Sequence, residues 1–482
     1  MIRREFPSMH ANLKIVSTAA LCALLAGCST VSNTASRLWP FGEDEGPQAV
    51  ASEGERVSIL QFEQTVEVAS ELANRTISLP APQAVTAWTQ PGGTAENLIE
   101  HAQAGEGFQV AWRRDIGAGS GTRTQVTSPI VAADGRIYVM DGHNEISAVD
   151  AASGSTIWRH SVTNDERDRR SLFSLSFGGG EANQGFGGGL AVAGGRVFVT
   201  SGLRVVTALD ATTGDVVWTS EVESPIHGAP TVSGNRVYAV DVDNQVIAFD
   251  TATGAQAWSY QAIAEPARIL RASSPAVTGE TVVTPFSSGE LIALRSSNGQ
   301  PLWQQVLSRT NRTNALSEIR DIAGRPVISR GMVYAGSHSG LFAAMDVRSG
   351  TPRWQLPIAT LNAPWVAGDA VYVTSKAGEL IAINRDTGQV YWIHDINENR
   401  SRQVGGVFGL FDREVRPIWS GPLLATNRLV LVSSEGEAVA LDARTGAEQA
   451  SLNLGGPAYI APIAYNGMIY VLTDEGQLVA IR

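Results

Sequence analysis

The sequence predicts an all-β fold, an eight-bladed β-propeller in which each blade is a four-stranded antiparallel sheet. Two observations predict it: a motif that recurs eight times along the chain, and a closing strand at the opposite end of the chain from the sheet that it would complete. Four-stranded units repeated radially form a propeller, and joining its two ends leaves no long sheet edge open. We assign the propeller to residues 107–482.

The N-terminus has the pattern of an export signal, and we expect residues 1–27 to be a signal peptide. Three basic residues precede an apolar run over residues 15–26. This run is shorter than the roughly 20 residues that a membrane-spanning helix needs. It ends in Leu-Ala-Gly before Cys28, which resembles the bacterial lipobox. That resemblance implies a lipid on Cys28, and Ser29 after it favours sorting to the outer membrane. An ordinary signal peptide with an incidental cysteine is the alternative.

Residues 28–106 are expected to be a lipidated tether followed by a segment that wraps the propeller. Residues 41–56 are rich in Gly, Glu, Pro and Ser, a composition typical of linkers. Residues 57–75 are more apolar, and we expect them to form a short helix or a docked strand. Pro80 and Pro82 would end that element.

The repeated motif reads Ala-x-Asp-x-x-Thr-Gly-x-x-x-Trp, with variations, and follows a segment rich in β-branched and aromatic residues. Such segments favour strands, while the Asp and Gly suit a tight turn, because Asp accepts hydrogen bonds from turn amides and Gly tolerates a positive φ. The Trp would lie on the outermost strand and fill the space between neighbouring blades. These structural tryptophans, with the one on the closing strand, are Trp112, Trp158, Trp218, Trp258, Trp303, Trp354 and Trp392.

The two ends of the repeat complement each other. The eighth unit stops at Arg482, before its turn and its Trp-bearing strand, and the missing strand type occurs just before the first unit, around Trp112. We therefore expect residues 107–117 to supply the last strand of the last blade and so close the ring.

Three insertions interrupt the period, at residues 159–187, 304–321 and 393–419. Loops on a rigid scaffold often carry function. The third insertion contains the apolar stretch Val407–Phe411, which would contact a partner or a membrane, or else pack beneath its own loop.

Composition argues against several function classes. The formal net charge is −11, which disfavours nucleic-acid binding because an acidic chain repels phosphate. The two cysteines, Cys22 and Cys28, precede the repeat, so no disulfide or cysteine metal site is expected in the propeller. The seven histidines show no spacing typical of zinc sites. We expect no catalytic residue, no metal and no cofactor.

The repeat resembles that of pyrroloquinoline-quinone-type propellers, which include the BamB family and quinone-dependent dehydrogenases. The lipobox, the eight units within 482 residues and the loop sequences at Trp88–Gly93 and Arg309–Asn311 are similar to BamB. This resemblance implies a non-enzymatic scaffold subunit of the outer-membrane β-barrel assembly complex, one that binds the periplasmic domains of BamA beside other subunits and aids insertion of outer-membrane proteins. It also implies a lipid-anchored location on the periplasmic face of the outer membrane.

The resemblance further implies a partner-binding patch on two loops. The residues that match it are Ile269, Leu270, Arg271, Ile319, Arg320 and Asp321. An exposed aliphatic anchor beside an arginine suits an interface, because the guanidinium binds carboxylates and carbonyls in a fork. The alternative is that Ile269 and Leu270 are buried beneath their loop and that Arg271 pairs locally.

Two other functions stay open at this point. A quinone-dependent periplasmic dehydrogenase would need a Ca²⁺ site of Glu, Asn and Asp and a catalytic Asp, whereas the aspartates of the motif recur once per blade and are explained by folding. A generic periplasmic adaptor would bind a different partner. Unfolded outer-membrane proteins are a further class of client, since outer strands expose backbone groups for pairing.

Overall fold

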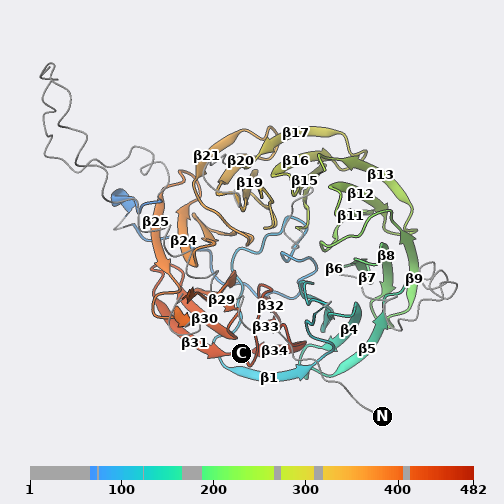
Figure 1. Cartoon of the computed structure of the whole chain (residues 1–482), viewed down its shortest axis with the longest axis horizontal. Coiled ribbons are helices and arrows are strands. Elements are labelled where there is room, and N and C mark those ends of the chain that lie inside the picture. Colours follow the sequence, from blue (N-terminus) through green and yellow to red (C-terminus); the bar gives the residue numbers. More distant parts are fainter. Residues whose placement is uncertain are drawn as a thin grey trace, which may run out of the picture. The chain divides into compact units, whose positions relative to one another are not determined.

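The computed structural model describes residues 66–72, 75–122, 124–164, 187–264, 273–308, 319–404 and 413–482. These residues form eight four-stranded antiparallel sheets set radially around one axis (Figure 1), which confirms the predicted propeller. In each blade the first strand lies nearest the axis and the fourth lies on the rim (Figure 1). The short 3-10 helix η2 (Ser70–Leu72) precedes the propeller.

The first four blades follow the chain in order. Blade 1 contains β2 (Val131–Ala133), β3 (Arg136–Met140), β4 (Glu145–Asp150) and β5 (Thr156–Ser161). Blade 2 contains β6 (Gly188–Ala193), β7 (Arg196–Ser201), β8 (Val205–Asp210) and β9 (Val216–Glu221). Blade 3 contains β10 (Thr231–Ser233), β11 (Arg236–Val240), β12 (Gln245–Asp250) and β13 (Gln256–Gln261). Blade 4 contains β14 (Ala276–Thr278), β15 (Thr281–Pro285), β16 (Glu290–Arg295) and β17 (Pro301–Val306).

The last four blades complete the circle. Blade 5 contains β18 (Val327–Ser329), β19 (Met332–Gly336), β20 (Phe342–Asp346) and β21 (Pro352–Leu356). Blade 6 contains β22 (Trp365–Ala367), β23 (Ala370–Thr374), β24 (Glu379–Asn384) and β25 (Val390–Asp395). Blade 7 contains β28 (Trp419–Ala425), β29 (Arg428–Ser433), β30 (Glu437–Asp442) and β31 (Glu448–Asn453). Blade 8 contains β32 (Ile463–Tyr465), β33 (Met468–Leu472), β34 (Gln477–Ile481) and β1 (Val110–Asp115).

Blade 8 combines the two ends of the propeller, as the sequence predicts. Strand β1 pairs antiparallel with β34, with Trp112 opposite Ala480. Just before β1, the backbone N–H of Gln109 donates to the carbonyl of Arg482 at 3.1 Å, and the N–H of Arg482 donates back at 2.9 Å. The ring is therefore closed by main-chain hydrogen bonds between residues that are far apart in the sequence.

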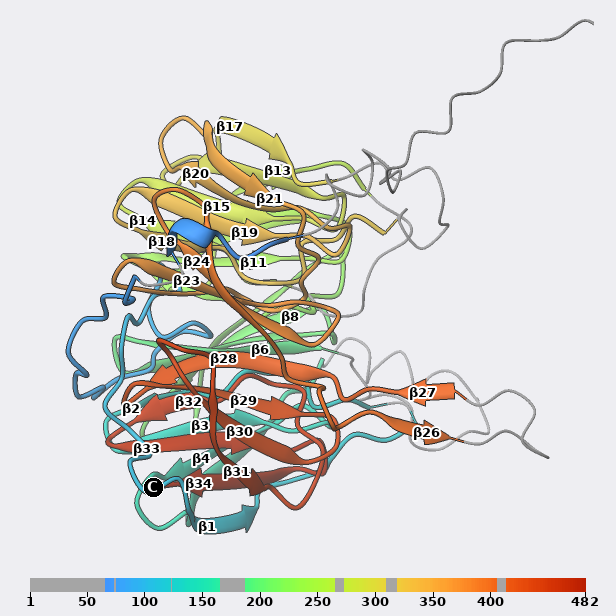
Figure 2. The same ribbon diagram turned by 90° about the vertical axis from the view of Figure 1, so that its left-hand side faces the viewer.

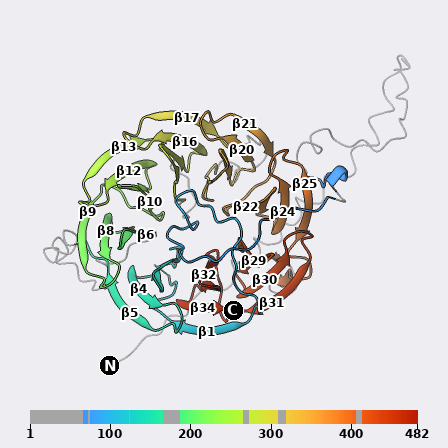
Figure 3. The ribbon, with the colours of Figure 1, turned by 180° about the vertical axis from the view of Figure 1, so that it is seen from behind.

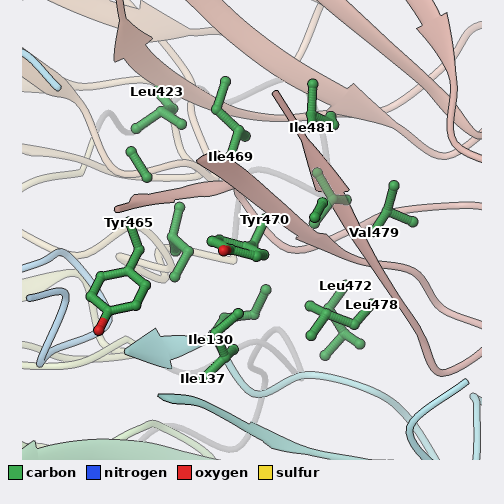
Figure 4. Packing of buried hydrophobic residues seen from close by; sticks show 14 of the residues in the cluster. Ile130, Ile137, Leu423, Tyr465, Ile469, Tyr470, Leu472, Leu478, Val479 and Ile481 are labelled. Carbon is green, nitrogen blue, oxygen red and sulfur yellow. The ribbon is translucent and has the colours of Figure 1, made fainter. Parts of the chain in front are cut away.

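The core lies between the blades. Middle strands such as β3 and β4 are buried almost throughout, because neighbouring blades cover both of their faces. Figure 4 shows this packing at the boundary of blades 8 and 1, where Tyr470 and Leu472 lie near Ile130 and Ile137. In the outer strands of blades 1 to 4, the motif tryptophan is the one buried residue. In β5 this residue is Trp158, which is 9% exposed.

Each motif tryptophan also joins its blade to the next one. The indole N–H of Trp158 in blade 1 donates to the carbonyl of Ala211 in blade 2 at 3.2 Å, and Trp218 and Trp258 repeat this bond to the following blades. The motif glycine of the next blade lies against the ring: a Cβ on Gly214 would stand 2.7 Å from Trp158. The tryptophan therefore fills the inter-blade space, as the sequence predicts.

The junction between blades 7 and 8 is built differently. Blade 7 has Ala450 at the tryptophan position, and blade 8 ends at Arg482 before its turn. Phe108 belongs to the same hydrophobic cluster as Ala450. The guanidinium of Arg428 lies 5.9 Å from the centre of the Phe108 ring. Arg113 of β1 donates to the carbonyl of Leu454 at 3.1 Å. Phe108 and Arg113 thus contribute contacts near a junction that has no motif tryptophan.

A strap over residues 75–108 lies across the end of the central channel (Figure 3). It makes hydrogen bonds to all eight blades in circular order, at their inner strands or at the turns that follow them. The contacts, in strap order, are Val85 O with Asn466 N, Trp88 with Ala132, Thr89 O with Val192 N, Gln90 with Val232, Ala95 O with Val277 N, Glu96 O with Ile328 N, Glu100 O with Trp365 Nε1, Ala102 N with Leu424 O and Gly105 N with Gly467 O. The strap forms the last part of residues 28–106, which the sequence analysis assigns to a tether and a wrapping segment.

Ahead of the strap, the expectation of a short helix or docked strand within residues 57–75 is met in small part. The described residues there contain η2 and a bridge that joins Val68 to Val390 of β25. The proposed signal peptide, Cys28 and the linker-like stretch lie outside the described residues.

Candidate protein-binding face

The two faces of the propeller differ. The strap covers the face that carries the turns between first and second strands, and the connections from one blade to the next emerge on the opposite face, where the hairpin of β26 (Arg402–Val404) and β27 (Arg413–Val415) projects (Figure 2). Strap contacts already occupy the first face. The connection face carries all three predicted insertions and is therefore the candidate site.

The connection from blade 4 to blade 5 is held by two neighbouring turns. The N–H of Ile322 donates to the carbonyl of Phe286 at 3.3 Å, in the blade 4 turn, and the N–H of His338 in blade 5 donates to the carbonyl of Asp321 at 2.9 Å. Gly289 lies beneath Arg320, since a Cβ there would be 2.9 Å from the Cβ of Arg320. These contacts fix Ile319–Asp321 over the boundary of blades 4 and 5.

Within this segment the three predicted patch residues differ in accessibility. Arg320 is exposed and Ile319 is partly exposed, whereas Asp321 is 5% exposed. Asp321 therefore offers little side-chain surface to a partner. The other half of the predicted patch, Ile269–Arg271, lies outside the described residues.

A basic pair that the sequence analysis did not single out lies beside this segment. The Nε2 atom of His338 is 2.6 Å from the Nζ atom of Lys376, and its Nδ1 atom is 3.3 Å from the carbonyl of Ile319. Burial lowers the pKa of His338, and the charge of Lys376 lowers it further. Burial also lowers the pKa of Lys376. His338 is thereby favoured as the neutral acceptor of a hydrogen bond from Lys376.

One signal in the sequence could have identified Lys376. The chain contains two lysines, Lys14 and Lys376, against 36 basic residues of both types. Lys376 is therefore the one lysine of the propeller. Its proximity to residue 319 could not be read from the sequence, because the two belong to different blades.

The base of the β26–β27 hairpin is anchored to blade 7. Arg400 donates to both carboxylate oxygens of Glu437, at 2.9 and 3.1 Å, and to both of Glu448, at 2.8 and 3.0 Å. These hydrogen bonds raise the pKa of Arg400 above its ordinary value. Its guanidinium also lies 5.7 Å from the ring of Trp419. The predicted apolar stretch Val407–Phe411 falls outside the described residues.

Three large apolar side chains are exposed in the connections of this face. They are Ile263, Ile418 and Tyr459, with 63%, 59% and 40% of their surface accessible. Ile418 and Tyr459 belong to adjacent connections that meet where the hydroxyl of Ser420 donates to the carbonyl of Tyr459 at 2.8 Å. Exposed apolar and aromatic side chains are typical of protein interfaces.

The central channel narrows to a cavity of about 70 Å³ beneath the strap, enough for a few water molecules. Among the described residues that line it there is no Asp or Glu. Trp88 Nε1 and Asn97 Oδ1 are buried there without a protein partner in the described chain, which suits ordered water. The donor set lacks the carboxylates that the Ca²⁺ of a quinone site would need, so this cavity does not fit that cofactor.

Over the described ranges, no three His, Cys, Asp or Glu side chains gather closely enough to hold a metal ion. The same part of the chain has no helix with the length and apolar character needed to cross a membrane.

A family model described as "Outer membrane protein assembly factor BamB" matches residues 95–169, 142–394 and 401–482. The chain belongs to the BamB family. BamB of Salmonella typhimurium is 29% identical over 376 residues, which cover 77% of this chain and 88% of that protein. BamB of Xanthomonas campestris is 32% identical over 373 residues, which cover 77% and 85% respectively. The family resemblance seen in the repeat is thus confirmed.

Solved structures show the same fold. BamB from Moraxella catarrhalis superposes with a TM-score of 0.59 at 19% identity, over 77% of this chain and 99% of that one. The quinohemoprotein alcohol dehydrogenase of Comamonas testosteroni has the same TM-score at 15% identity, over 82% and 80%. At these identities the likeness concerns the propeller architecture that BamB shares with the dehydrogenases.

Proposed function

We propose that this chain is a non-catalytic scaffold subunit of the outer-membrane β-barrel assembly complex, which binds the periplasmic domains of BamA through its connection face and aids insertion of outer-membrane proteins. Membership in the BamB family carries this proposal, because its relatives are named outer membrane protein assembly factors. The absence of carboxylates from the described lining of the axial cavity supports a non-catalytic role.

The proposed organisation follows from the N-terminal sequence. Residues 1–27 are the signal peptide, Cys28 carries the lipid that holds the protein on the periplasmic face of the outer membrane, and residues 28–106 tether and wrap the propeller. The strap described above supports the wrapping role of the last part of this segment.

The proposed partner-binding residues are Ile269, Leu270, Arg271, Ile319 and Arg320. Arg320 is exposed and its backbone is held by two blades, which suits an arginine that meets a partner with little loss of conformational freedom. Asp321 is proposed to support this segment from below, through its buried position and its main-chain bond to His338.

Affinity purification from detergent-solubilised cell envelope tests the partner. We expect BamA to co-purify with the tagged chain, and the Arg271→Glu, Arg320→Glu pair to lower its recovery about tenfold or more, because each reversal places a repulsive charge in the interface. Arg204→Glu is the matched control, since Arg204 is an exposed arginine in a blade 2 turn on the same face. Full recovery with the double variant would refute the patch, and absence of BamA would assign the chain to a different, generic adaptor role.

The lone lysine of the propeller allows the binding face to be mapped independently. Because the pKa of Lys376 is lowered, its amine is more often neutral and reactive toward an amine-specific crosslinker. We expect a crosslink from Lys376 to BamA in the complex, identified by mass spectrometry, and its loss in Lys376→Arg. A BamA complex that forms normally but never crosslinks at Lys376 would place the interface elsewhere.

A further inference from the structure

A cleft on the rim between blades 5 and 6 carries an unusual concentration of positive charge. Its volume is about 410 Å³. Four arginines and two aspartates line it, over an apolar floor from Met332 and Tyr334. The charged residues are Arg330, Arg348, Arg353, Arg385, Asp346 and Asp386. This basic cleft lies in a chain whose formal net charge is −11, so its sign is opposite to that of the molecule as a whole.

The internal repeat shows that the fold does not require these arginines. Arg385 follows the last residue of the third strand, and the other blades with this turn have small or apolar residues there: Ala151, Ala211, Thr251, Ser296, Val347 and Ala443. Arg353 precedes the motif tryptophan, where blades 1 to 4 have Ile157, Val217, Ala257 and Leu302. The six other turns of this kind, and the outer strands of blades 1 to 4, thus form without a charge at the equivalent position.

Arg330 occupies a turn position whose φ is positive in all eight blades, and Asp134, Thr426 and Asn466 hold it in blades 1, 7 and 8. It has a φ of +50°, and blades 2, 3, 4 and 6 have glycine at the same turn position. A left-handed conformation is unfavourable for a residue with a long side chain, so retaining arginine there costs stability. Its guanidinium is already paired with Glu100 of the strap, at 3.2 Å.

Arg385 lies at the bottom of the cleft and is 4% exposed. Its Nη1 donates to the carbonyl of Gly368 at 2.9 Å and its Nη2 to the hydroxyl of Ser329 at 3.1 Å, while the guanidinium carbon lies 5.8 Å from the ring centre of Tyr334. These partners are all uncharged. A buried guanidinium without an anion is costly, because its charge is removed from water and not neutralised.

The two aspartates of the cleft offset only part of the charge of its four arginines. Asp346 accepts hydrogen bonds from the N–H groups of Arg348 and Ser349, which hold its own turn. Asp386 has 65% of its side chain exposed and lies 3.9 Å from Arg353. The side chains of Arg348 and Arg353 are exposed at the mouth of the cleft. Arg353 donates through Nε to the carbonyl of Asp386 at 3.0 Å, which leaves its other N–H groups and those of Arg348 to meet a ligand.

We propose that this cleft binds a phosphate-bearing anion. Guanidinium groups from separate turns and strands converge on it, and phosphate offers three or more acceptor oxygens to them, against the two of a carboxylate. The same chemistry is present in a free phosphate or pyrophosphate and in the headgroup of an anionic phospholipid. The cleft is distinct from the proposed patch on the opposite face, so this inference does not depend on BamA binding.

Isothermal titration of the full chain at constant ionic strength tests the proposal. The probes are pyrophosphate, monomeric dihexanoylphosphatidylglycerol and, for comparison, a hexaglutamate peptide. We expect at least one phosphate probe to bind, and its identity distinguishes a free phosphate from a lipid headgroup. Failure of both phosphate probes, or tighter binding of hexaglutamate, would overturn the proposal.

Substitutions at the cleft localise the binding. Arg348→Gln with Arg353→Gln should weaken it about tenfold or more, as expected when charge-assisted hydrogen bonds are lost. Arg444→Gln is the matched control, because Arg444 occupies the same turn position in blade 7 as Arg348 does in blade 5. Equal effects of the cleft and control substitutions would refute the assignment.

Arg385→Ala separates binding from folding, because it installs the residue that blades 1, 2 and 7 already have. We expect a folded protein whose thermal midpoint without ligand is not lowered and whose phosphate binding is lost. A lowered midpoint with binding retained would show that Arg385 is structural and would contradict the proposal.

Discussion

At the scale of single residues, seven of the eight blade junctions have a glycine that lies against a tryptophan. Gly254 has a φ of +75°, and a Cβ on it would stand 2.5 Å from the Trp218 ring of the preceding blade. The conformation and the contact therefore both require glycine at this position, whereas a turn glycine such as Gly234 is required by the conformation alone.

Gly254→Ala is expected to destabilise the protein by about 2–4 kcal/mol, the sum of a strained left-handed alanine and an overpacked junction. Gly234→Ala is the control, because Gly234 in the same blade has a φ of +58° and open space around it. It should cost about 1 kcal/mol. Urea denaturation monitored by tryptophan fluorescence compares the two, and equal losses would show that the ring contact is unimportant.

The motif aspartates make a prediction about acid stability. Asp210 accepts hydrogen bonds from the N–H groups of Thr213 and Thr212, and Asp250 accepts them from the hydroxyl and the N–H of Thr253. These bonds lower the pKa of each carboxyl below its ordinary 3.8. Since the folded pKa is the lower one, this stabilisation is present above pH 3.8 and is lost as the pH falls through the folded values. In blade 6, Asn384 makes the same turn bonds without a charge.

We therefore expect Asp210→Asn with Asp250→Asn to fold and to lose less of its thermal midpoint between pH 6 and pH 3 than the unaltered chain does. Circular dichroism melts across that range measure the difference. An unchanged pH dependence would show that these turns do not contribute to acid unfolding.

The residue scale also shows where the sequence stops being informative. The turn aspartate, the glycine and the tryptophan follow from the repeat, because each blade repeats the same local contacts. The burial of Asp321 does not follow, because His338 and Phe286, which hold its segment, come from the turns of two different blades. The basic cleft was missed for the same reason, since its arginines are dispersed from residue 330 to 385.

At the scale of elements, the strap bonds blade 3 through a side chain, that of Gln90, where a neighbouring strand would use its main chain. The amide of Gln90 donates to the carbonyl of Val232 at 3.1 Å and accepts from its N–H at 3.1 Å, as a neighbouring strand would. Gln90 is 3% exposed. Its removal would leave both groups of β10 buried without a partner.

Gln90→Leu is accordingly expected to lower the free energy of unfolding by about 2–4 kcal/mol, because unsatisfied buried polar groups cost about 1–3 kcal/mol each. Gln103→Leu, at an exposed strap position, is the control and should change stability little. Hydrogen exchange at the amide of Val232 reports the effect directly, and unchanged protection there would contradict this account.

The composition of residues 28–106 predicts that part of the segment wraps the propeller, but it could not predict the path. The strap has no period, because it contacts each blade through a different group. The insertion hairpin of β26 and β27 was likewise predicted only as a long loop, since its two strands pair with each other and not with a blade.

At the scale of the whole molecule, the ring closure predicted from the unmatched ends of the repeat is confirmed by the pairing of β1 with β34. Closure also removes the edge that β34 would otherwise expose. The strap and the closing strand are adjacent in sequence but perform separate tasks, so truncation can distinguish them.

A chain that begins at residue 107 keeps β1 and loses the strap, whereas one that begins at Ile116 loses both. We expect the first to remain monomeric with a lowered thermal midpoint, and the second to associate through the open edge of β34. Size-exclusion chromatography with light scattering separates the outcomes. A monomeric, soluble chain from Ile116 would show that the ring does not need its borrowed strand.

The borrowed strand also sets an order of events. Ribosomes make β1 among the first propeller strands, yet its partner β34 is the last strand to be made. Nearly the whole propeller must therefore be synthesised before β1 can pair with β34. The loop that this pairing closes is long, and closing it costs conformational entropy. A chain whose synthesis stops before β34 would leave β1 unpaired and its last blade without a complete sheet. Incomplete copies would therefore differ from complete ones by an exposed strand.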